Sequence, residues 1–307
     1  MTSEPAENLP ASAAQPQVKP TPKILPYVAL LMGVLALSMS SLFIRWSSAP
    51  GTMTSFYRML IASGVLTVIL LRARGTAGLK ISKKWLWLPL LGGLFSGLDH
   101  SVWSTAIGST RLANATLLNN MAPLWVALFA LVIWRMRLGG RFWLGLILAL
   151  AGAGVVFGHD ILSNPHLGWG DLLAIFSSLF YAGYFLVTQR ARRTLDTLPY
   201  IWLSAIASAV VLLVVNLVSG HSFANYPAQT WFAFIAAGLF SQVVGYFSLV
   251  YALGHLPAFI VAPSMVAQPV LTALLAIPLA GEGLSVSQWL GGMITIVGIY
   301  LVNISQE

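Results

Sequence analysis

The stretch that decides the fold is NNMAPLWVALFALVIWRMRLGGRFWLGLILALAG at residues 119–152, because a related stretch, MVAQPVLTALLAIPLAGEGLSVSQWLGGMITIVG, follows at residues 265–298. Laid over each other without a gap, the two stretches share residues at a fixed separation of 146 positions. The shared residues include Pro123 with Pro269, Trp143 with Trp289, Gly145 with Gly291 and Gly152 with Gly298. Chance alignment of apolar sequence explains these matches poorly. The sequence therefore predicts two copies of one structural unit.

The composition excludes a water-soluble fold. Of the 307 residues, 58% are hydrophobic and only 8% are charged, whereas roughly a quarter of an ordinary soluble domain is charged. Because about 20 apolar residues cross a bilayer, nearly the whole chain is used up by about ten crossings. The fold class predicted is an all-α membrane protein with ten transmembrane helices. The chain has no cysteine, which excludes disulfides and thiolate metal sites.

Hydropathy windows of about 19 residues place the ten spans. The first five are expected near Tyr27–Ile44, Thr52–Leu71, Trp85–Ile107, Leu112–Trp134 and Phe142–Val156. The second five are expected near Trp169–Val187, Tyr200–Val218, Trp231–Leu253, Ala258–Leu279 and Val286–Asn303. We expect residues 24–158 and 168–304 to form the two units. Residues 1–23 are polar, with no apolar core, and are predicted to be a disordered cytoplasmic tail.

The number of spans and the loop charges predict how the units are oriented. A unit with five spans must enter its second copy from the opposite side, so the two units are predicted to be inverted. Inverted repeats are typical of secondary transporters. Basic residues gather in alternate connections between the spans, which predicts that both termini are cytoplasmic. This distribution indicates membrane topology and not a surface that binds nucleic acid. The basic residues on the predicted cytoplasmic side are Lys19, Lys23, Arg72, Arg74, Lys80, Lys83, Lys84, Arg135, Arg137, Arg141, Arg190, Arg192 and Arg193.

Residues 265–298 resemble the closing pattern of the EamA repeat, which defines the drug/metabolite transporter superfamily. Residues 56–62 (FYRMLIA) look like the arginine-containing second span of such repeats. The first unit departs from the pattern, since Arg135-Met136-Arg137 stands where Gly281-Glu282-Gly283 stands in the second. The resemblance implies a ten-span exporter of small metabolites in the bacterial inner membrane, with an amino-acid exporter of the YddG type as the expected kind. Other members carry nucleotide sugars or drug-like cations.

Two ionisable side chains, Arg58 and Asp99, are predicted to lie deep within spans, where such groups usually face a cavity or a partner. Both should sit at one depth, so we expect them to pair directly or through water. The pair is interpreted either as a fixed structural link or as part of gating or proton coupling. His100 is a candidate proton site because its charge can change near neutral pH. A neutral packing histidine is the alternative.

Other polar residues in the spans are candidates to line a substrate cavity. His100 and Trp103 share one face of the third span, and Gln242 and Tyr246 share the equivalent face of the eighth. The remaining candidates are Asn119, Tyr181, Ser264 and Gln268. Pro123 and Pro269 remove backbone donors in mid-membrane, so they are interpreted as hinges or as tolerated bends. Serines such as Ser40, Ser177 and Ser178 are interpreted mainly as hydrogen bonds between helices.

The motifs that are missing also bear on function. The chain has no phosphate-binding glycine loop with lysine, no His-Glu-x-x-His pattern and no Gly-x-Ser-x-Gly elbow, which argues against an ATP-driven pump or a membrane hydrolase. No metal, cofactor or nucleic-acid partner is expected.

The function predicted is therefore a secondary transporter, not an enzyme. It would export amino acids or related small metabolites by alternating access around a central cavity. The alternatives are a gated pore, a membrane-embedded binding scaffold and, last, an intramembrane enzyme. The expected partners are a small-molecule substrate and the lipid bilayer. A monomer is expected, with a dimer through glycine-rich spans left open.

Overall fold

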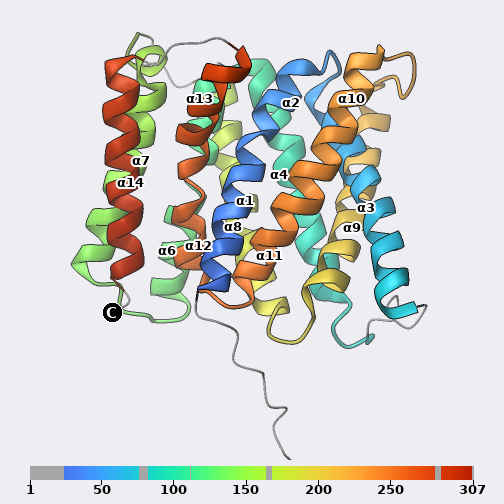
Figure 1. Cartoon of the computed structure of the whole chain (residues 1–307), viewed down its shortest axis with the longest axis horizontal. Coiled ribbons are helices and arrows are strands. Elements are labelled where there is room, and N and C mark those ends of the chain that lie inside the picture. The colour runs from blue at the N-terminus through green and yellow to red at the C-terminus, as the bar shows by residue number, and fades with distance from the viewer. Residues whose placement is uncertain (1–23, 76–81, 111, 164–167, 281–284, 306–307) are drawn as a thin grey trace, which may run out of the picture.

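The computed structural model describes residues 24–75, 82–110, 112–163, 168–280 and 285–305, and every regular element in them is a helix. The predicted tail, residues 1–23, lies outside the described residues, as does the Gly281-Glu282 segment. The helices lie side by side along one common direction (Figure 1). The predicted all-helical class is confirmed.

The helices of the first half begin with α1 (Leu25–Ser38) and end with α7, and their bounds follow the expected spans closely. They are α1, α2 (Ser40–Trp46), α3 (Gly51–Arg74), α4 (Trp87–Ser109), α5 (Leu112–Asn119), α6 (Ala122–Val132) and α7 (Gly140–Ser163). Three of the five expected spans are therefore single helices. The first and fourth are each divided into two helices, α1 with α2 and α5 with α6.

The second half runs from α8 to α14. Its elements are α8 (Trp169–Ala191), α9 (Thr197–Val218), α10 (Ala228–Ala236), the π-helix η2 (Ala237–Tyr246), α11 (Phe247–Leu253), α12 (Ala258–Ser264), α13 (Ala267–Ala280) and α14 (Val286–Ile304). When adjoining helices are counted together, eight described segments of the chain are long and apolar enough to cross a membrane. The apolar part of α7, Gly140–Val156, is shorter than these. α4 is less apolar because it carries Asp99, His100 and several serines.

Three of the expected spans are interrupted. α1 ends before Met39, α5 ends before Asn120 and α12 ends before Met265. Proline accounts for two of these breaks, because it lacks an N–H and clashes with the preceding turn. Pro123 lies in the first turn of α6 and Pro269 is the third residue of α13. The expected continuous helices are therefore corrected to pairs of half-helices at these points.

The eighth span contains a π-helix, which differs from the continuous α-helix expected there. Residues Ala237–Tyr246 adopt this wider winding between α10 and α11. Two glycines in it pack closely on neighbouring helices: Gly238 against Ile61 and the Arg58 carbonyl of α3, and Gly245 against Leu37 of α1. π-helical segments are rare and frequently occur at functional sites. Gln242 and Tyr246 are both in this segment.

α7 and α14 make a close glycine contact. A Cβ added to Gly145 would lie 2.7 Å from the carbonyl oxygen of Gly298, and one added to Gly298 would lie 2.6 Å from that of Gly145. Gly152 and Gly291 face each other in the same way, at 2.6 and 2.7 Å. At the separation of 146 positions, Gly145 corresponds to Gly291 and Gly152 to Gly298. The second contact is therefore equivalent to the first with the two halves exchanged. Small residues at these positions let the two backbones approach closely.

Helices from both halves surround α4, which carries the central polar residues. Gly93 of α4 packs on the backbone of α9, where the Ser208 Oγ donates a hydrogen bond to its carbonyl at 2.8 Å. Gly183 of α8 packs against Phe95 on another face of α4. α3 is tied to α9 by the Trp202 indole, which donates to Thr67 Oγ1 at 2.8 Å. The site therefore forms where helices of the two halves interleave.

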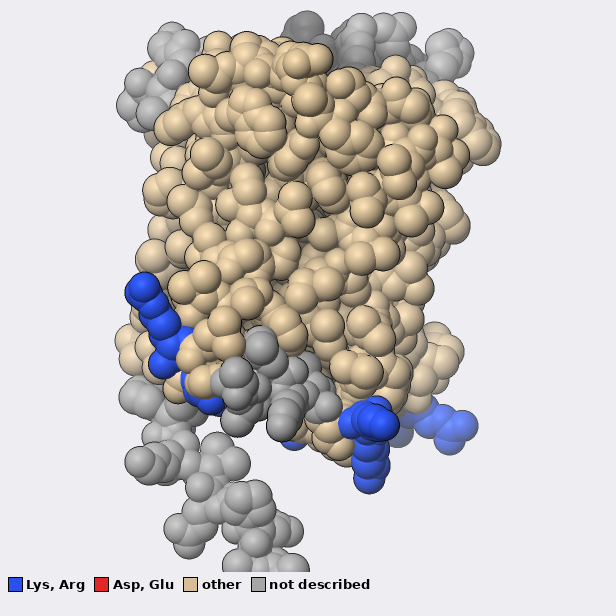
Figure 2. Space-filling view, turned by 90° about the vertical axis from the view of Figure 1, so that its right-hand side faces the viewer, with Lys and Arg blue, Asp and Glu red and all other residues tan. Residues whose placement is uncertain are grey.

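Basic side chains gather at one end of the bundle. Figure 2 shows Lys and Arg at the lower end of the face in view, whereas the described surface above them on that face is uncharged. At this end Arg74, in the last turn of α3, forms an exposed 2.6 Å ion pair with Asp196, just before α9. The loop between α8 and α9 therefore lies beside the end of α3.

Candidate functional site

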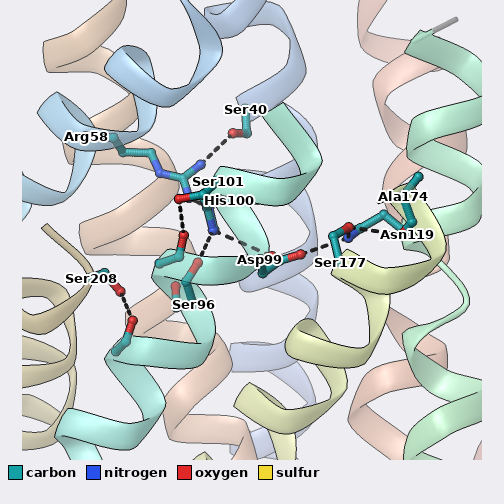
Figure 3. A network of polar contacts seen from close by, with 12 residues as sticks. Ser40, Arg58, Ser96, Asp99, His100, Ser101, Asn119, Ala174, Ser177 and Ser208 are labelled. Carbon is teal, nitrogen blue, oxygen red and sulfur yellow. Dashed lines mark hydrogen bonds and ion pairs between the residues drawn. The ribbon is translucent and has the colours of Figure 1, made fainter. Parts of the chain in front are cut away.

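The centre of the site is Arg58 of α3, which is only 5% exposed. Its Nη1 donates to Ser40 Oγ on α2 at 3.1 Å, and its Nη2 contacts Nε2 of His100 on α4. The guanidinium carbon lies 5.7 Å from the centre of the Tyr246 ring, a cation–π arrangement. Among the described residues, Arg58 and Asp99 form no ion pair. Of the two arrangements expected, the direct pair is therefore not formed, because the His100 ring takes the position beside the guanidinium (Figure 3).

The hydrogen bonds of His100 define its tautomer. Its Nδ1 lies 2.8 Å from the carbonyl oxygen of Ser96, one turn earlier in α4. A carbonyl can only accept, so we assign the proton to Nδ1. In a neutral imidazole Nε2 then carries the lone pair, and this atom faces Arg58, which can only donate. His100 is therefore assigned as a neutral acceptor for the guanidinium.

Asp99 lies on the other side of His100 and is held by Asn119 of α5. Asn119 Nδ2 donates to Asp99 Oδ1 at 2.9 Å and to Ser177 Oγ of α8 at 2.7 Å. The second carboxylate oxygen, Oδ2, lies 3.6 Å from His100 Nδ1. Polar contacts thus run without a gap from Ser40 through Arg58, His100 and Asp99 to Ser177, as Figure 3 shows.

Tyrosines from the second half cover this chain of contacts. The Tyr246 ring lies 6.4 Å from that of His100 and 5.7 Å from that of Tyr184, centre to centre. The Tyr181 phenol lies close to Tyr246 and to Gln268 of α13. The structure therefore brings together the following predicted residues: Arg58, Asp99, His100, Asn119, Tyr181, Tyr246 and Gln268.

The other candidates differ in their surroundings. Ser264 Oγ donates to the Ile260 carbonyl at 3.0 Å and lies 3.4 Å from Asn303 Nδ2, which ties α12 to α14 and gives this serine a structural contact. Trp103 Nε1 and Gln242 Oε1 are buried without a hydrogen-bond partner in the described chain, and so is Arg58 Nε. Unpartnered buried polar atoms are costly and call for an explanation such as water, an ion or a ligand.

Sequence reasoning gave too little weight to two serines of α8. Ser177 accepts from Asn119, and Ser178 Oγ accepts from the Trp125 indole of α6 at 2.7 Å. Both serines are fully buried. Their position one turn before Tyr181 was the available signal, since residues spaced by three or four share a helix face.

At the end of the bundle opposite the basic residues, α3 is fastened to the second half. The Tyr57 hydroxyl donates to the Phe223 carbonyl at 2.6 Å, and its ring stacks on Phe234 at 4.7 Å. Thr52 Oγ1 donates to Asn216 Oδ1 at 2.8 Å. The described polar cluster around Arg58 is thus covered at this end by contacts between the two halves.

At the basic end, Arg192 fastens α8 to α11. Its guanidinium donates to the carbonyl oxygens of Leu195 and, at 3.3 Å, Val250. It also lies against Gly254, where an added Cβ would come within 2.8 Å of Nη2. Burial lowers the pKa of Arg192 from its usual value. Hydrogen bonds between helices are thus described at both ends of the bundle, on either side of the central cluster.

The helix lengths, their apolar surfaces and the buried polar centre define a multi-pass membrane protein. The EamA-like transporter family model matches residues 24–158 and 168–304. The chain belongs to the EamA-like transporter family. Within the described residues, no group of three or more His, Asp and Glu side chains is placed to hold a metal ion.

Related proteins are named as transporters. An "Uncharacterized transporter" of Archaeoglobus fulgidus is 27% identical over 258 residues, which is 82% of this chain and 88% of that protein. "Uncharacterized transporter YwfM" of Bacillus subtilis is 25% identical, over 72% of this chain and 75% of that protein. "Uncharacterized inner membrane transporter YedA" of Escherichia coli is 24% identical over 53% of each chain. These names support a membrane transporter and point away from an enzyme.

A solved crystal structure is similar in fold. It superimposes with a TM-score of 0.77 and covers 91% of this chain and 96% of its own, at 19% sequence identity. At this identity the likeness shows the shared fold alone.

Proposed function

We propose that this protein is a secondary transporter that exports amino acids or related small metabolites by alternating access, without ATP. The observation that carries the proposal is the buried polar cluster in the middle of a transporter-family bundle. Both halves contribute to it: Arg58, Asp99, His100 and Asn119 from the first, and Ser177, Tyr181, Tyr246 and Gln268 from the second. Ionisable groups at this depth are expensive and usually functional. A role in transport explains the presence of these groups in the spans.

The proposed architecture is a pair of inverted five-helix repeats, residues 24–158 and 168–304. The glycine contacts between α7 and α14 support it, because Gly145 meets Gly298 while Gly152 meets Gly291. Such an exchange of equivalent residues is typical of a two-fold interface. Along α7 from Gly145 to Gly152, the contacted residue of α14 changes from Gly298 to Gly291, so the two helices run antiparallel. Two inverted copies give two arrangements of similar energy that face opposite sides of the membrane.

The chemistry of the cluster favours substrates with few or balanced charges. Arg58 and Asp99 are one cation and one carboxylate, and the other members are neutral side chains. Nucleotide sugars or polyphosphates would require several inward-facing cations. Amino acids, as zwitterions, match this set, which supports the proposal that the protein is similar to amino-acid exporters of the YddG type. We propose a monomer as the working unit, with the bilayer as its other partner.

We propose that the protein lies in a bacterial inner membrane with both termini in the cytoplasm, and the gathering of basic residues at one end supports this. The chain has no cysteine, so single cysteines give a clean test of orientation. Gln229→Cys, at the end opposite the basic residues, should react with an impermeant maleimide in intact cells. Arg193→Cys should react only after permeabilisation. The reverse pattern would contradict this orientation.

The central experiment is flux through the purified full chain in liposomes. Twenty amino acids and a few organic cations are offered in turn, with protein-free liposomes as the control. Saturable movement of at least one amino acid, accelerated by the same solute on the far side, is the expected result. Absence of saturable flux for every solute would contradict the proposal.

A gated pore is the second candidate, since the same helices can surround a channel. Substrate on the far side accelerates a carrier, whereas flux through a pore rises linearly with concentration and shows no acceleration. A membrane-embedded binding scaffold would bind solute without any flux. The same liposome experiment thus separates the three.

A further inference from the structure

The buried guanidinium of Arg58 has no carboxylate partner. Its guanidinium donates to the hydroxyl of Ser40, contacts the neutral ring of His100 and lies beside the Tyr246 hydroxyl, while its Nε has no described partner. No described carboxylate oxygen lies within ion-pair distance of it, since Asp99 points to Asn119 on the far side of His100 (Figure 3). A buried cation is costly unless a negative charge and hydrogen bonds compensate it. The charge of Arg58 is therefore balanced only indirectly, by Asp99 on the far side of His100, and by no described charged group in direct contact.

We propose that Arg58 binds the carboxylate of the transported substrate, and that His100 holds the guanidinium while the site is empty. The inference rests on the proposed transport function and names the residue that recognises the substrate. A guanidinium presents N–H groups in a planar fork that matches both oxygens of a carboxylate. The unpartnered Nε leaves one edge of the fork free to take such a group.

His100 is suited to give way to a carboxylate. Its Nδ1 stays anchored to the Ser96 carbonyl, while Nε2 offers Arg58 a single neutral lone pair. The contact with His100 is charge-assisted by the guanidinium alone, whereas a carboxylate carries the opposite charge and can accept two N–H groups in parallel. An incoming carboxylate thus replaces a neutral acceptor with a charged one and compensates the buried charge as well.

An acceptor for the other end of a zwitterion lies on the π-helix. Gln242 is 3% exposed and its Oε1 has no described partner. It stands between Gly238, which packs against the Arg58 carbonyl, and Tyr246, whose ring faces the Arg58 guanidinium. Arg58 Nε is thus an unsatisfied donor and Gln242 Oε1 an unsatisfied acceptor, and the residues four positions before and after Gln242 both contact Arg58. This pairing fits a ligand with a carboxylate and an ammonium group, as in an amino acid.

Ligand binding to the detergent-purified full chain tests the inference without requiring transport. Sodium benzoate is titrated against benzamide, which has nearly the same shape but no charge, at constant ionic strength, and the thermal unfolding midpoint is followed. Benzoate should raise the midpoint of the wild type, and benzamide should not. Arg58→Gln should weaken the benzoate effect about tenfold or more, as expected when a buried charge-assisted bond is lost. An equal response in wild type and Arg58→Gln, or no response in wild type, overturns the inference.

Three further variants sharpen the result. Arg190→Gln removes an exposed arginine of the same chain and should leave the benzoate response unchanged. His100→Ala removes the competing acceptor, so benzoate should bind more tightly; weaker binding would contradict the role of His100. Arg58→Lys keeps the cation but loses the fork, and should give an intermediate response. The last two variants decide the question if Arg58→Gln does not fold.

Flux measurements separate this inference from the proposed function. The amino acid with the highest liposome flux is compared with its amide in wild type and Arg58→Gln. If Arg58→Gln still transports the acid in preference to the amide, the carboxylate site is wrong and the transport function stands. If no solute is transported but benzoate binding depends on Arg58, the transport function is wrong and the anion site stands.

Discussion

Gly152 of α7 lies directly against the backbone of α14, where a Cβ added to it would stand 2.5 Å from the amide nitrogen of Thr295. Gly154 lies two residues further along α7, and a Cβ added there would meet no atom of a neighbouring helix within 4 Å. The two positions therefore form a matched pair in one helix.

Gly152→Ala should destabilise the protein, and Gly154→Ala should not. The new methyl group of the first would force α7 and α14 apart, at a cost of about 1–3 kcal/mol. The second replaces glycine with a better helix former and should be neutral or stabilising by up to about 1 kcal/mol. Thermal unfolding of the purified chain measures both. Equal midpoints for the two variants would mean that this helix contact is not tight.

Asp99→Asn should flatten the dependence of liposome flux on pH between about pH 5 and 8, and His100→Ala tests whether the ring, neutral in this arrangement, takes up a proton during transport. The two groups are buried next to each other, with Asp99 Oδ2 3.6 Å from His100 Nδ1, so each affects the proton affinity of the other. Asp196→Asn makes the same change at an exposed carboxylate and serves as the control. If neither central variant changes the pH profile, the proposed proton role is wrong.

Pro269→Ala should change the turnover number and KM of transport together, each by several-fold, as substitutions at hinges often do. Alanine restores the missing backbone donor and lets α12 and α13 join into one helix, which removes the break at Met265. Pro227→Ala, at the exposed start of α10, is the matched control. Unchanged flux parameters for Pro269→Ala would favour a tolerated bend over a hinge, and Pro123→Ala tests the equivalent break in the first half.

Arg192→Gln should lower the thermal unfolding midpoint, whereas its neighbour Arg193→Gln should have little effect. Arg192 donates to the carbonyls of Leu195 and Val250, and loss of these part-buried hydrogen bonds costs about 1 kcal/mol. The Arg193 side chain is exposed and has no hydrogen bond in the described structure, so a change within about 0.5 kcal/mol is expected. Comparable losses in both variants would point to a general effect of charge at this end.

The helical class could be predicted from the sequence, but the breaks in the helices could not. Long apolar windows report length and hydropathy, which are sufficient for placing α3, α8, α9 and α14. A window of about 19 residues averages over single residues, so it cannot separate α5 from α6 at Asn120. Pro123 was the one local signal for that break.

The site could be predicted in its members but not in its pairings. Arg58, Asp99 and His100 stand out because ionisable groups are rare in apolar spans. Their partners depend on how each helix is rotated, which apolar periodicity fixes only loosely when both lipid and protein faces are hydrophobic. Hence His100, rather than Asp99, lies against Arg58.

The wide winding of Ala237–Tyr246 has a consequence for how the molecule could change shape. If this stretch rewound into an α-helix, the part of the helix that follows it would rotate about the helix axis. The rotation would be about 100° for each residue by which the register shifts. Tyr246 would then swing away from the guanidinium while α10 stayed in place. Such a rewinding would be a screw motion within a single helix, and it would need neither a flexible loop nor the movement of a whole repeat.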